Sequence, residues 1–256
     1  MWKRARAMFT PDQRARLRTD LLERAAADPR ISGAAITGSA AAEREDRWSD
    51  IDLAFGVGDA SELQNVLSGW TSHMYERHGA LHHVDVKSGA WIYRVFFLAS
   101  TLQVDLAFVP AAEFRPLAST FRLVFGAARE PTHSPGQAPA DLIGMAWLYA
   151  LHARSCIARS RLWQAEFMIS GVRDHGLALA CVRHGLPAAH GRGMDLLPYE
   201  AAAPFEGALV RQLDVDELRR AFGVAIRGLL GEIRNIDGEL AARLQGALLD
   251  LTDQTI

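Results

Sequence analysis

The stretch Ile36-Thr37-Gly38-Ser39, followed after ten residues by Asp50-Ile51-Asp52-Leu53-Ala54-Phe55, decides the fold of this chain. It predicts a short strand that ends at a glycine-serine turn, then a loop, then a second strand. Side chains alternate between the two faces of a strand. Asp50 and Asp52 are therefore expected on one face, while Ile51 and Leu53 point into a core.

The two aspartates predict a divalent metal, because carboxylates a few ångströms apart repel one another unless a cation lies between them. An oxygen-only ligand set favours Mg²⁺ or Mn²⁺. Gly38 allows backbone N–H groups to approach an anion closely, and Ser39 adds a hydroxyl donor. Phosphate at Gly38 and Ser39, with metal at the aspartates, predicts a site for a nucleoside triphosphate and its magnesium.

A Gly-Ser pair, a gap of about ten residues and an Asp-hydrophobic-Asp strand resemble the signature of the polymerase-beta-type nucleotidyltransferase superfamily. In that family a third carboxylate follows on a later apolar strand. Asp105 matches it within Leu102–Val109, and Asp85 in Val84-Asp85-Val86 is a rival. Asp105 is preferred because its strand is more apolar and ends in Phe108-Val109-Pro110. The alternative to the whole motif is a solvated aspartate pair beside an ordinary turn.

The resemblance covers residues 31–110, and the helical remainder is similar in plan to the small antibiotic nucleotidyltransferases. It implies a metal-dependent enzyme that transfers a nucleoside monophosphate, AMP from ATP in the leading case, to a hydroxyl of a small molecule. An aminoglycoside or a lincosamide is the leading acceptor. Asp50, Asp52 and Asp105 would hold two Mg²⁺ ions, with Mn²⁺ as the alternative.

By the same resemblance, Gly38 and Ser39 would bind the β and γ phosphates of ATP or another nucleoside triphosphate. Arg44 and Arg47, in the loop 40–49, are candidate triphosphate contacts, although a solvated loop is the favoured interpretation for either one taken alone. The alternative function is an antitoxin-like or regulatory protein of this fold that modifies or binds a protein partner. An intact set of three carboxylates argues against a non-catalytic protein of this kind.

The composition of the chain limits the classes of binding partner and the cellular compartment that are expected. The 256 residues carry a formal net charge of -2, which together with the lack of a basic, aromatic-interleaved tract argues against a nucleic-acid substrate. The two cysteines lie in apolar helical patterns and indicate buried thiols in a reducing compartment. Neither a signal peptide nor a membrane span is recognisable, so the cytoplasm is the expected location. Oligomeric state is left open.

The pattern along the chain predicts an α+β protein in which a mixed-sheet nucleotidyltransferase domain, residues 1–135, precedes a helical domain, residues 136–256. Helices are expected over 10–28 and 59–78, and three successive antiparallel strands over 81–87, 91–98 and 102–109. Residues 113–127 are expected to be helical or irregular. The Pro- and Gly-rich run 131–139 is the expected linker.

The second domain is expected to be a bundle of four helices, over 142–159, 162–184, 213–230 and 235–251, the first of them capped by Asp141. The second helix is mostly apolar, but Glu166, Ser170 and Arg173 share one face of it. Glu166 is the candidate general base, since an acid on an apolar helix can have the raised pKa that a base requires. An ion pair of Arg173 with Glu166 or Asp174 is the structural alternative.

Two further patterns carry weaker hypotheses. His82 and His83 with Asp85 have the residue types of a zinc site, but adjacent strand residues point in opposite directions, so a strand of mixed exposure is favoured. The basic, glycine-rich loop 190–193 lacks the flanking strand and helix of a nucleotide-binding loop, and a plain connection is favoured there.

Overall fold

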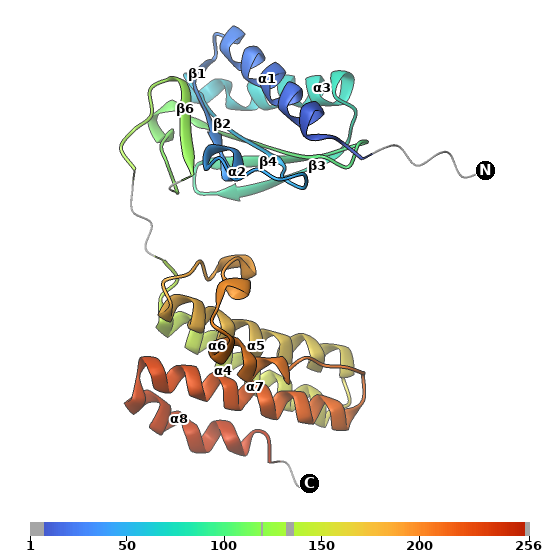
Figure 1. The fold of residues 1–256 in the computed structure, drawn as a ribbon, viewed down its shortest axis with the longest axis vertical. Helices are drawn as coiled ribbons and strands as arrows, with labels where there is room; N and C mark the ends of the chain where they lie inside the picture. Colours follow the sequence, from blue (N-terminus) through green and yellow to red (C-terminus); the bar gives the residue numbers. More distant parts are fainter. Residues whose placement is uncertain (1–7, 119, 132–135, 254–256) are drawn as a thin grey trace, which may run out of the picture. The chain divides into compact units, whose positions relative to one another are not determined.

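The structure is a computed structural model that describes residues 8–118, 120–131 and 136–253. It divides into two compact units, Met1–Ser134 and Pro135–Ile256, which are described separately (Figure 1). Residues 132–135 of the expected linker lie outside the described residues. Within the described part of the chain, no helix is both long and apolar enough to cross a bilayer.

The first unit contains a mixed six-stranded sheet in the order β3-β4-β5-β2-β1-β6. Its only parallel pair among the described strands is β2 with β5, and all other neighbours are antiparallel. This sheet, followed by a helical second unit, confirms the predicted α+β class. The strands are β1 (Ile31–Thr37), β2 (Ile51–Val57), β3 (Ala80–Ser88), β4 (Trp91–Leu98), β5 (Gln103–Pro110) and β6 (Phe121–Gly126).

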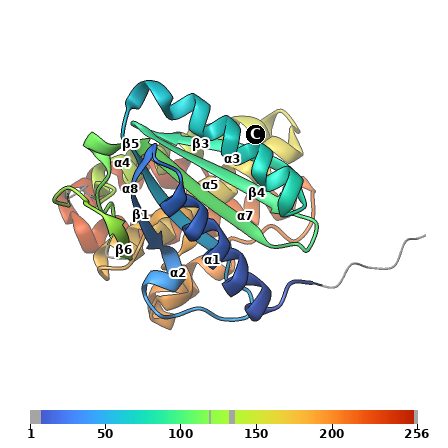
Figure 2. The same ribbon diagram turned by 90° about the horizontal axis from the view of Figure 1, so that it is seen from above.

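Two helices, α1 (Pro11–Ala27) and α3 (Leu63–Arg77), lie side by side over one face of the sheet (Figure 2). α1 begins at a capping box between Thr10 and Gln13, as its sequence predicts. The 3-10 turn η1 (Ala60–Glu62) leads into α3. The main core of this unit lies between the helices and the sheet, where the ring of Trp70 contacts Phe55 in a tilted arrangement and Phe108 edge to face. The face of β2 that carries Phe55 therefore packs against the helices.

The prediction for residues 113–127 is wrong in its second half. After the 3-10 turn η2 (Ala111–Glu113), residues Phe121–Gly126 form β6, an edge strand that pairs with β1. Most of its side chains are exposed or half-buried, so no alternation of apolar and polar residues marks it. Its backbone partners come from β1, some 90 residues earlier in the chain, and local sequence does not reveal such a pairing.

The second unit is a helical bundle built on α4 (Pro139–Ala158), α5 (Leu162–Arg183), α7 (Val215–Ile236) and α8 (Gly238–Asp250). Alanines and branched aliphatic residues make up most of its core. Asp141 does not cap α4: the N-cap is Ala138, whose side chain makes no capping bond, and Asp141 lies in the first turn. Proline at the first helical position removes one of the backbone N–H groups that the start of a helix leaves unpaired.

Sequence reasoning missed three short elements of this unit: η3 (Ala189–Gly191), η4 (Met194–Leu196) and α6 (Tyr199–Glu206). Phe205 of α6 is buried and inserts between α5 and α7. Its ring occupies the space that a Cβ would fill at Gly176 of α5 and at Gly228 of α7. Two glycines on facing helices therefore make the socket that holds α6.

Candidate metal and nucleotide site

Three carboxylates meet on the sheet face opposite α1 and α3. The parallel pairing of β2 with β5 sets Asp52 directly beside Asp105. Asp50 immediately precedes β2, and one carboxylate oxygen from each of the three residues lies within 4.8 Å of the others. Each is half-buried. Because Leu53 and Leu106 point into the helix-covered core, alternation along both strands requires the aspartates to face the other way.

Asp85, the rival third carboxylate, lies elsewhere. Its Oδ1 accepts a hydrogen bond of 2.7 Å from Nε of Arg94, whose Nη1 also reaches the Leu67 carbonyl of α3. Asp85 therefore faces the helices, and the Arg94 guanidinium lowers its pKa. His83 is bonded to the Tyr75 hydroxyl at 3.0 Å. Among the described residues only the three aspartates form a cluster suited to a metal, so the zinc interpretation of His82, His83 and Asp85 is wrong.

Gln103 joins the carboxylate cluster and was missed by the sequence analysis. Its Nε2 donates to Asp105 Oδ1 at 3.0 Å and, more weakly, to Asp50 Oδ2 at 3.4 Å. Gln103 is two residues before Asp105 on the same strand, so the period of two could have placed it on this face. Its amide supplies partial positive charge between two carboxylates.

The electrostatics of the cluster are those of a site that favours added positive charge. Burial raises the pKa of Asp105 to about 6, the charge of Asp50 adds to the rise, and the hydrogen bond from Gln103 opposes it. Because burial and the charge of Asp50 destabilise the ionised form of Asp105, a cation bound at the cluster would stabilise that form. The donor set therefore fits a hard divalent ion such as Mg²⁺ or Mn²⁺.

The raised pKa of Asp105 predicts how stability depends on pH. Between the usual pKa near 4 and the folded value near 6, the unfolded chain ionises this group before the folded chain does. The free energy of unfolding of the metal-free protein should therefore fall as the pH rises through this window, and Asp105→Asn should remove that component. Thermal melts of both proteins at several pH values check this. Parallel pH profiles for the two proteins would contradict it.

Gly38 lies against Asp52 and has a conformation that other residues rarely adopt. Strand β1 ends at Thr37, and the short helix α2 (Gly38–Ala41) begins at Gly38, whose φ is +63°. A Cβ at this position would overlap the carboxylate of Asp52. Glycine is required here both by the backbone angle and by the close approach. The turn after β1 is thus fixed to within contact distance of the aspartate cluster.

Ser39 carries an unsatisfied polar group at the same turn. Its Oγ is buried, and within the described residues it has no hydrogen-bond partner. A hydroxyl buried without a partner costs about 1–3 kcal/mol. The cost is recovered when an external acceptor, such as a phosphate oxygen, takes the hydrogen bond. Ser39 therefore fits the role of a phosphate-binding donor.

A buried arginine fastens the loop that leads to Asp50. Nη1 of Arg14, on α1, donates to the carbonyls of Asp46 at 2.6 Å and Ser49 at 2.9 Å. Glu45 forms ion pairs with Arg14 and Arg18, at 3.1 and 2.6 Å. Only 4% of Arg14 is exposed. The sequence carried one signal of this role, since Arg14 precedes Leu21 and Ala25 at helical spacing and so lies on their buried face.

The two loop arginines are exposed. The guanidinium of Arg47 lies over the ring of Trp48, 4.8 Å from its centroid, and the backbone N–H of Arg44 donates to the Ser39 carbonyl at 2.9 Å. Trp48 is itself 67% exposed, so it does not anchor the loop in a core. Contact of either arginine with a triphosphate stays a prediction.

Glu166 is half-buried on α5 in the second unit. Its Oε1 accepts a hydrogen bond of 2.8 Å from the Ser170 hydroxyl. Arg173 pairs with Asp174 at 2.8 Å, so of the two ion pairs expected for Arg173 the structure forms the one with Asp174. Its role as a general base stays a prediction.

Comparisons with known proteins are sparse. No family model and no curated protein matches the sequence. One solved structure that matches is an aminoglycoside 6-adenyltransferase from Bacillus subtilis, aligned over 91% of this chain and 96% of its own, with 10% identity and a TM-score of 0.40. At this level of similarity the match carries no conclusion about activity, which has to be argued from the site.

Proposed function

We propose that this chain is a metal-dependent nucleotidyltransferase that transfers a nucleoside monophosphate, AMP from ATP in the leading case, to a hydroxyl of a small molecule. The observation that carries the proposal is the meeting of three carboxylates with the Gly38-Ser39 turn. Such a cluster suits metal, and the adjacent unsatisfied hydroxyl suits phosphate.

In the proposed reaction the acceptor hydroxyl oxygen attacks the α-phosphorus, the bond from that phosphorus to the β-phosphate oxygen breaks, and pyrophosphate leaves. Asp50, Asp52 and Asp105 would hold two Mg²⁺ ions, which when bound neutralise the charge on the attacking and leaving oxygens. Ser39 Oγ would donate to a β or γ phosphate oxygen, and Gly38 would allow the backbone to approach it. Gln103 would keep the carboxylates of Asp50 and Asp105 in place through its amide.

Replacing Ser39 with alanine should separate binding from stability. The metal-free variant is expected to be as stable as the original protein or slightly more so, because a buried hydroxyl without a partner is removed. Its affinity for a non-hydrolysable ATP analogue with Mg²⁺ should fall by about tenfold, the loss of one charge-assisted hydrogen bond. Calorimetric titration and a thermal melt measure the two effects. Unchanged nucleotide affinity would remove Ser39 from the site.

Glu166 is proposed as the base that takes the proton of the acceptor hydroxyl. Support comes from its position on a largely apolar helix and from the Ser170 hydroxyl, which fixes one carboxylate oxygen and leaves the other to accept a proton. Glu166→Gln should lower the rate of the chemical step by about 10²–10⁴-fold while nucleotide affinity holds.

Asp174→Asn is the matched control, because Asp174 is a carboxylate on the same helix that is already paired with Arg173. Single-turnover kinetics with both variants decide between the two acids. Loss of the chemical step in Asp174→Asn alone would transfer the role to Asp174. A lower melting temperature with full activity in Glu166→Gln would make Glu166 structural.

The acceptor is proposed by resemblance to be an aminoglycoside or a lincosamide. The experiment is a transfer screen in which each nucleoside triphosphate, labelled at the α-phosphate, is offered with a panel of antibiotics and cellular hydroxyl compounds. A labelled adduct that needs Mg²⁺ or Mn²⁺ would support the proposal and identify the acceptor. Label appearing on a protein instead would favour the regulatory alternative.

A further inference from the structure

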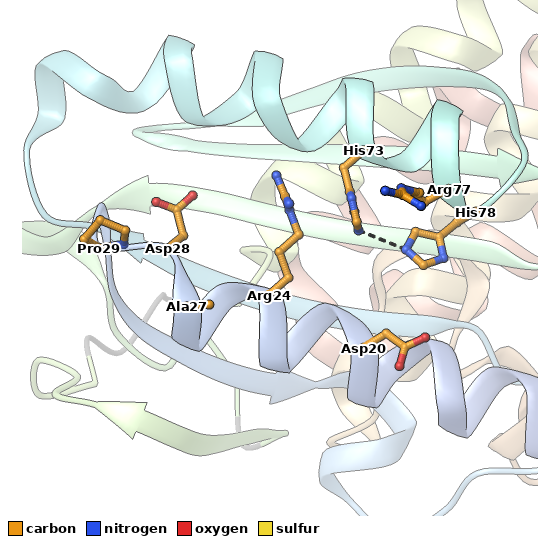
Figure 3. Close-up of a pocket in the computed structure, with 8 residues that line it drawn as sticks. All are labelled: Asp20, Arg24, Ala27, Asp28, Pro29, His73, Arg77 and His78. Carbon is orange, nitrogen blue, oxygen red and sulfur yellow. Dashed lines mark hydrogen bonds between the residues drawn. The ribbon is translucent and has the colours of Figure 1, made fainter.

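A cavity lined by charged residues and histidines lies between α1 and α3, on the face of the sheet opposite the three aspartates. Its volume is about 700 Å³. Figure 3 shows its lining, with Asp20 and Arg24 coming from α1 and His73, Arg77 and His78 from the C-terminal end of α3. The proposed transfer reaction uses none of these residues.

Two guanidinium groups from facing helices supply most of the charge of the cavity. Arg24 lies over the ring of Trp70, 5.1 Å from its centroid, and makes one long hydrogen bond of 3.4 Å to the Gly69 carbonyl. Its Nε is buried, and the described residues offer it no hydrogen-bond partner. Arg77 is exposed, and it forms no ion pair with a carboxylate in the described part of the chain. Both cations are therefore available to an anionic ligand.

Two histidines extend this cluster. The Nε2 atoms of His73 and His78 are 3.0 Å apart in a mutual hydrogen bond, drawn as a dashed line in Figure 3. One of them donates and the other accepts, so the bond requires one ring to be unprotonated at Nε2. Burial and, to a smaller extent, the charge of Arg24 lower the pKa of His73 to about 4. Burial also lowers the pKa of His78. The pair is therefore neutral at pH 7.

Of the two acidic residues of the cavity, Asp20 offsets part of this charge, since it raises the pKa values of His73 and His78. Asp28 accepts two hydrogen bonds from the Arg30 guanidinium, at 2.9 and 2.8 Å, so its charge is already paired. Asp20 is exposed and lies at the other end of the cavity from Asp28 (Figure 3). Arg24, Arg77 and the histidine pair line the same cavity, and these groups have more hydrogen-bond donors than the two acids can use.

We infer that this cavity binds a phosphoryl oxyanion, held by the guanidinium groups of Arg24 and Arg77 and by a donor nitrogen of the His73–His78 pair. Guanidinium groups from two sides match the several oxygens of a phosphate or pyrophosphate better than the two oxygens of one carboxylate. A divalent cation is disfavoured, because two arginines repel it and the Nε2 atoms of the two histidines are bonded to each other. Free phosphate, pyrophosphate and the phosphate of a nucleotide share this chemistry.

Binding should be linked to proton uptake. The charged groups that face the histidines are Arg24 and Asp20 from α1 and Arg77 from α3, and Asp28 is neutralised by Arg30. Burial is the main reason that the histidines are neutral, and the charges of Arg24 and Arg77 lower their pKa values further. An anion seated between the arginines offsets this second contribution, so the pKa values of the histidines rise on binding. A ligand that binds with proton uptake binds more tightly as the pH falls. Occupancy of the cavity would therefore depend on both the anion concentration and the pH.

The test is calorimetric titration of the full-length, metal-free protein with sulfate, orthophosphate, pyrophosphate and AMP, and with acetate as a monoanionic control. Sulfate remains a dianion from pH 8 to pH 6, so any pH dependence of its affinity belongs to the protein. Sulfate should bind more tightly at pH 6, and acetate should not compete. The relative affinities of phosphate, pyrophosphate and AMP distinguish the sources of the phosphoryl group.

Arg77→Gln should weaken anion affinity by about tenfold or more, because one charged donor is lost on an exposed side chain that the fold does not need. Arg219→Gln, at an arginine 49% exposed on α7, is the matched control and should bind as the original protein does. The double variant His73→Asn, His78→Asn should remove the pH dependence. The inference is overturned if Arg77→Gln binds sulfate normally, if acetate competes equally, or if Ser39→Ala rather than Arg77→Gln abolishes binding. None of these results depends on the proposed transfer activity.

Discussion

Replacing Asp52 with asparagine is expected to abolish nucleotidyl transfer while leaving the protein folded. Asp52 and Asp105 are directly paired across β2 and β5, so loss of either carboxylate removes a ligand from the centre of the proposed metal site. Metal ions contribute several kcal/mol of transition-state stabilisation in such sites, and each 1.36 kcal/mol is a factor of ten in rate. The turnover number with Mg²⁺ should therefore fall by about 10³-fold or more, as a steady-state assay would measure.

Asp85→Asn is the matched control for this experiment. It makes the same chemical change on the same sheet, but Asp85 faces the helices and pairs with Arg94. It should lose stability, because Arg94 loses the carboxylate that it pairs with, and should keep activity below its melting temperature.

Asp50→Asn should have the opposite effects. It should be inactive, yet at least as stable without metal, since the Asp50 charge opposes ionisation of Asp105. Near-normal turnover in either Asp50→Asn or Asp52→Asn would refute the metal assignment.

Replacing Gly38 with alanine should damage both stability and activity. The left-handed backbone angle costs a residue with a Cβ about 1–3 kcal/mol. The added methyl group also overlaps the Asp52 carboxylate, and overpacking of this kind costs about 1–3 kcal/mol more. Because the carboxylate has to move to admit the methyl group, we expect transfer to fall by about 10²-fold, the effect typical of a misplacement of about 1 Å.

Gly89→Ala separates these two causes. Gly89 joins β3 to β4 with a φ of +57°, nearly the same as that of Gly38, and a Cβ there would meet no atom within 4 Å. It should show the backbone penalty alone and keep full activity. Denaturant unfolding and the transfer assay, run on both variants, isolate the contact with Asp52 as the difference between them. Equal losses of stability and activity in the two variants would show that the contact does not matter.

The centre of the candidate site could be predicted because its geometry follows from local rules. Alternation along a strand places Asp50 and Asp52 on one face whatever the rest of the fold does. The family resemblance called for a third carboxylate, and the apolar character and the ending of its strand favoured Asp105 over Asp85. The parallel register of β2 with β5 sets Asp105 beside Asp52. The turn at Gly38 is likewise local, although its contact with Asp52 is visible only in three dimensions.

What the sequence did not predict depends on contacts between distant segments. Strand β6 exists through its pairing with β1, and α6 through the socket that Gly176 and Gly228 leave for Phe205. Neither has a strong pattern of its own. Arg14 lies more than thirty residues before the carbonyls that it holds, and its charge made a buried position unexpected. Gln103 was overlooked because the motif formed by Gly-Ser and the three aspartates has no position for a glutamine.

Binding of Mn²⁺ tests the central claim most directly, because it needs no knowledge of the acceptor. Titration of the metal-free protein with Mn²⁺, in the presence of a non-hydrolysable ATP analogue and followed by electron paramagnetic resonance, counts bound ions. The account predicts saturable binding by the original protein and by Asp85→Asn, and its loss in Asp50→Asn and Asp52→Asn. Binding that is absent from the original protein, or that persists unchanged in Asp52→Asn, would contradict it.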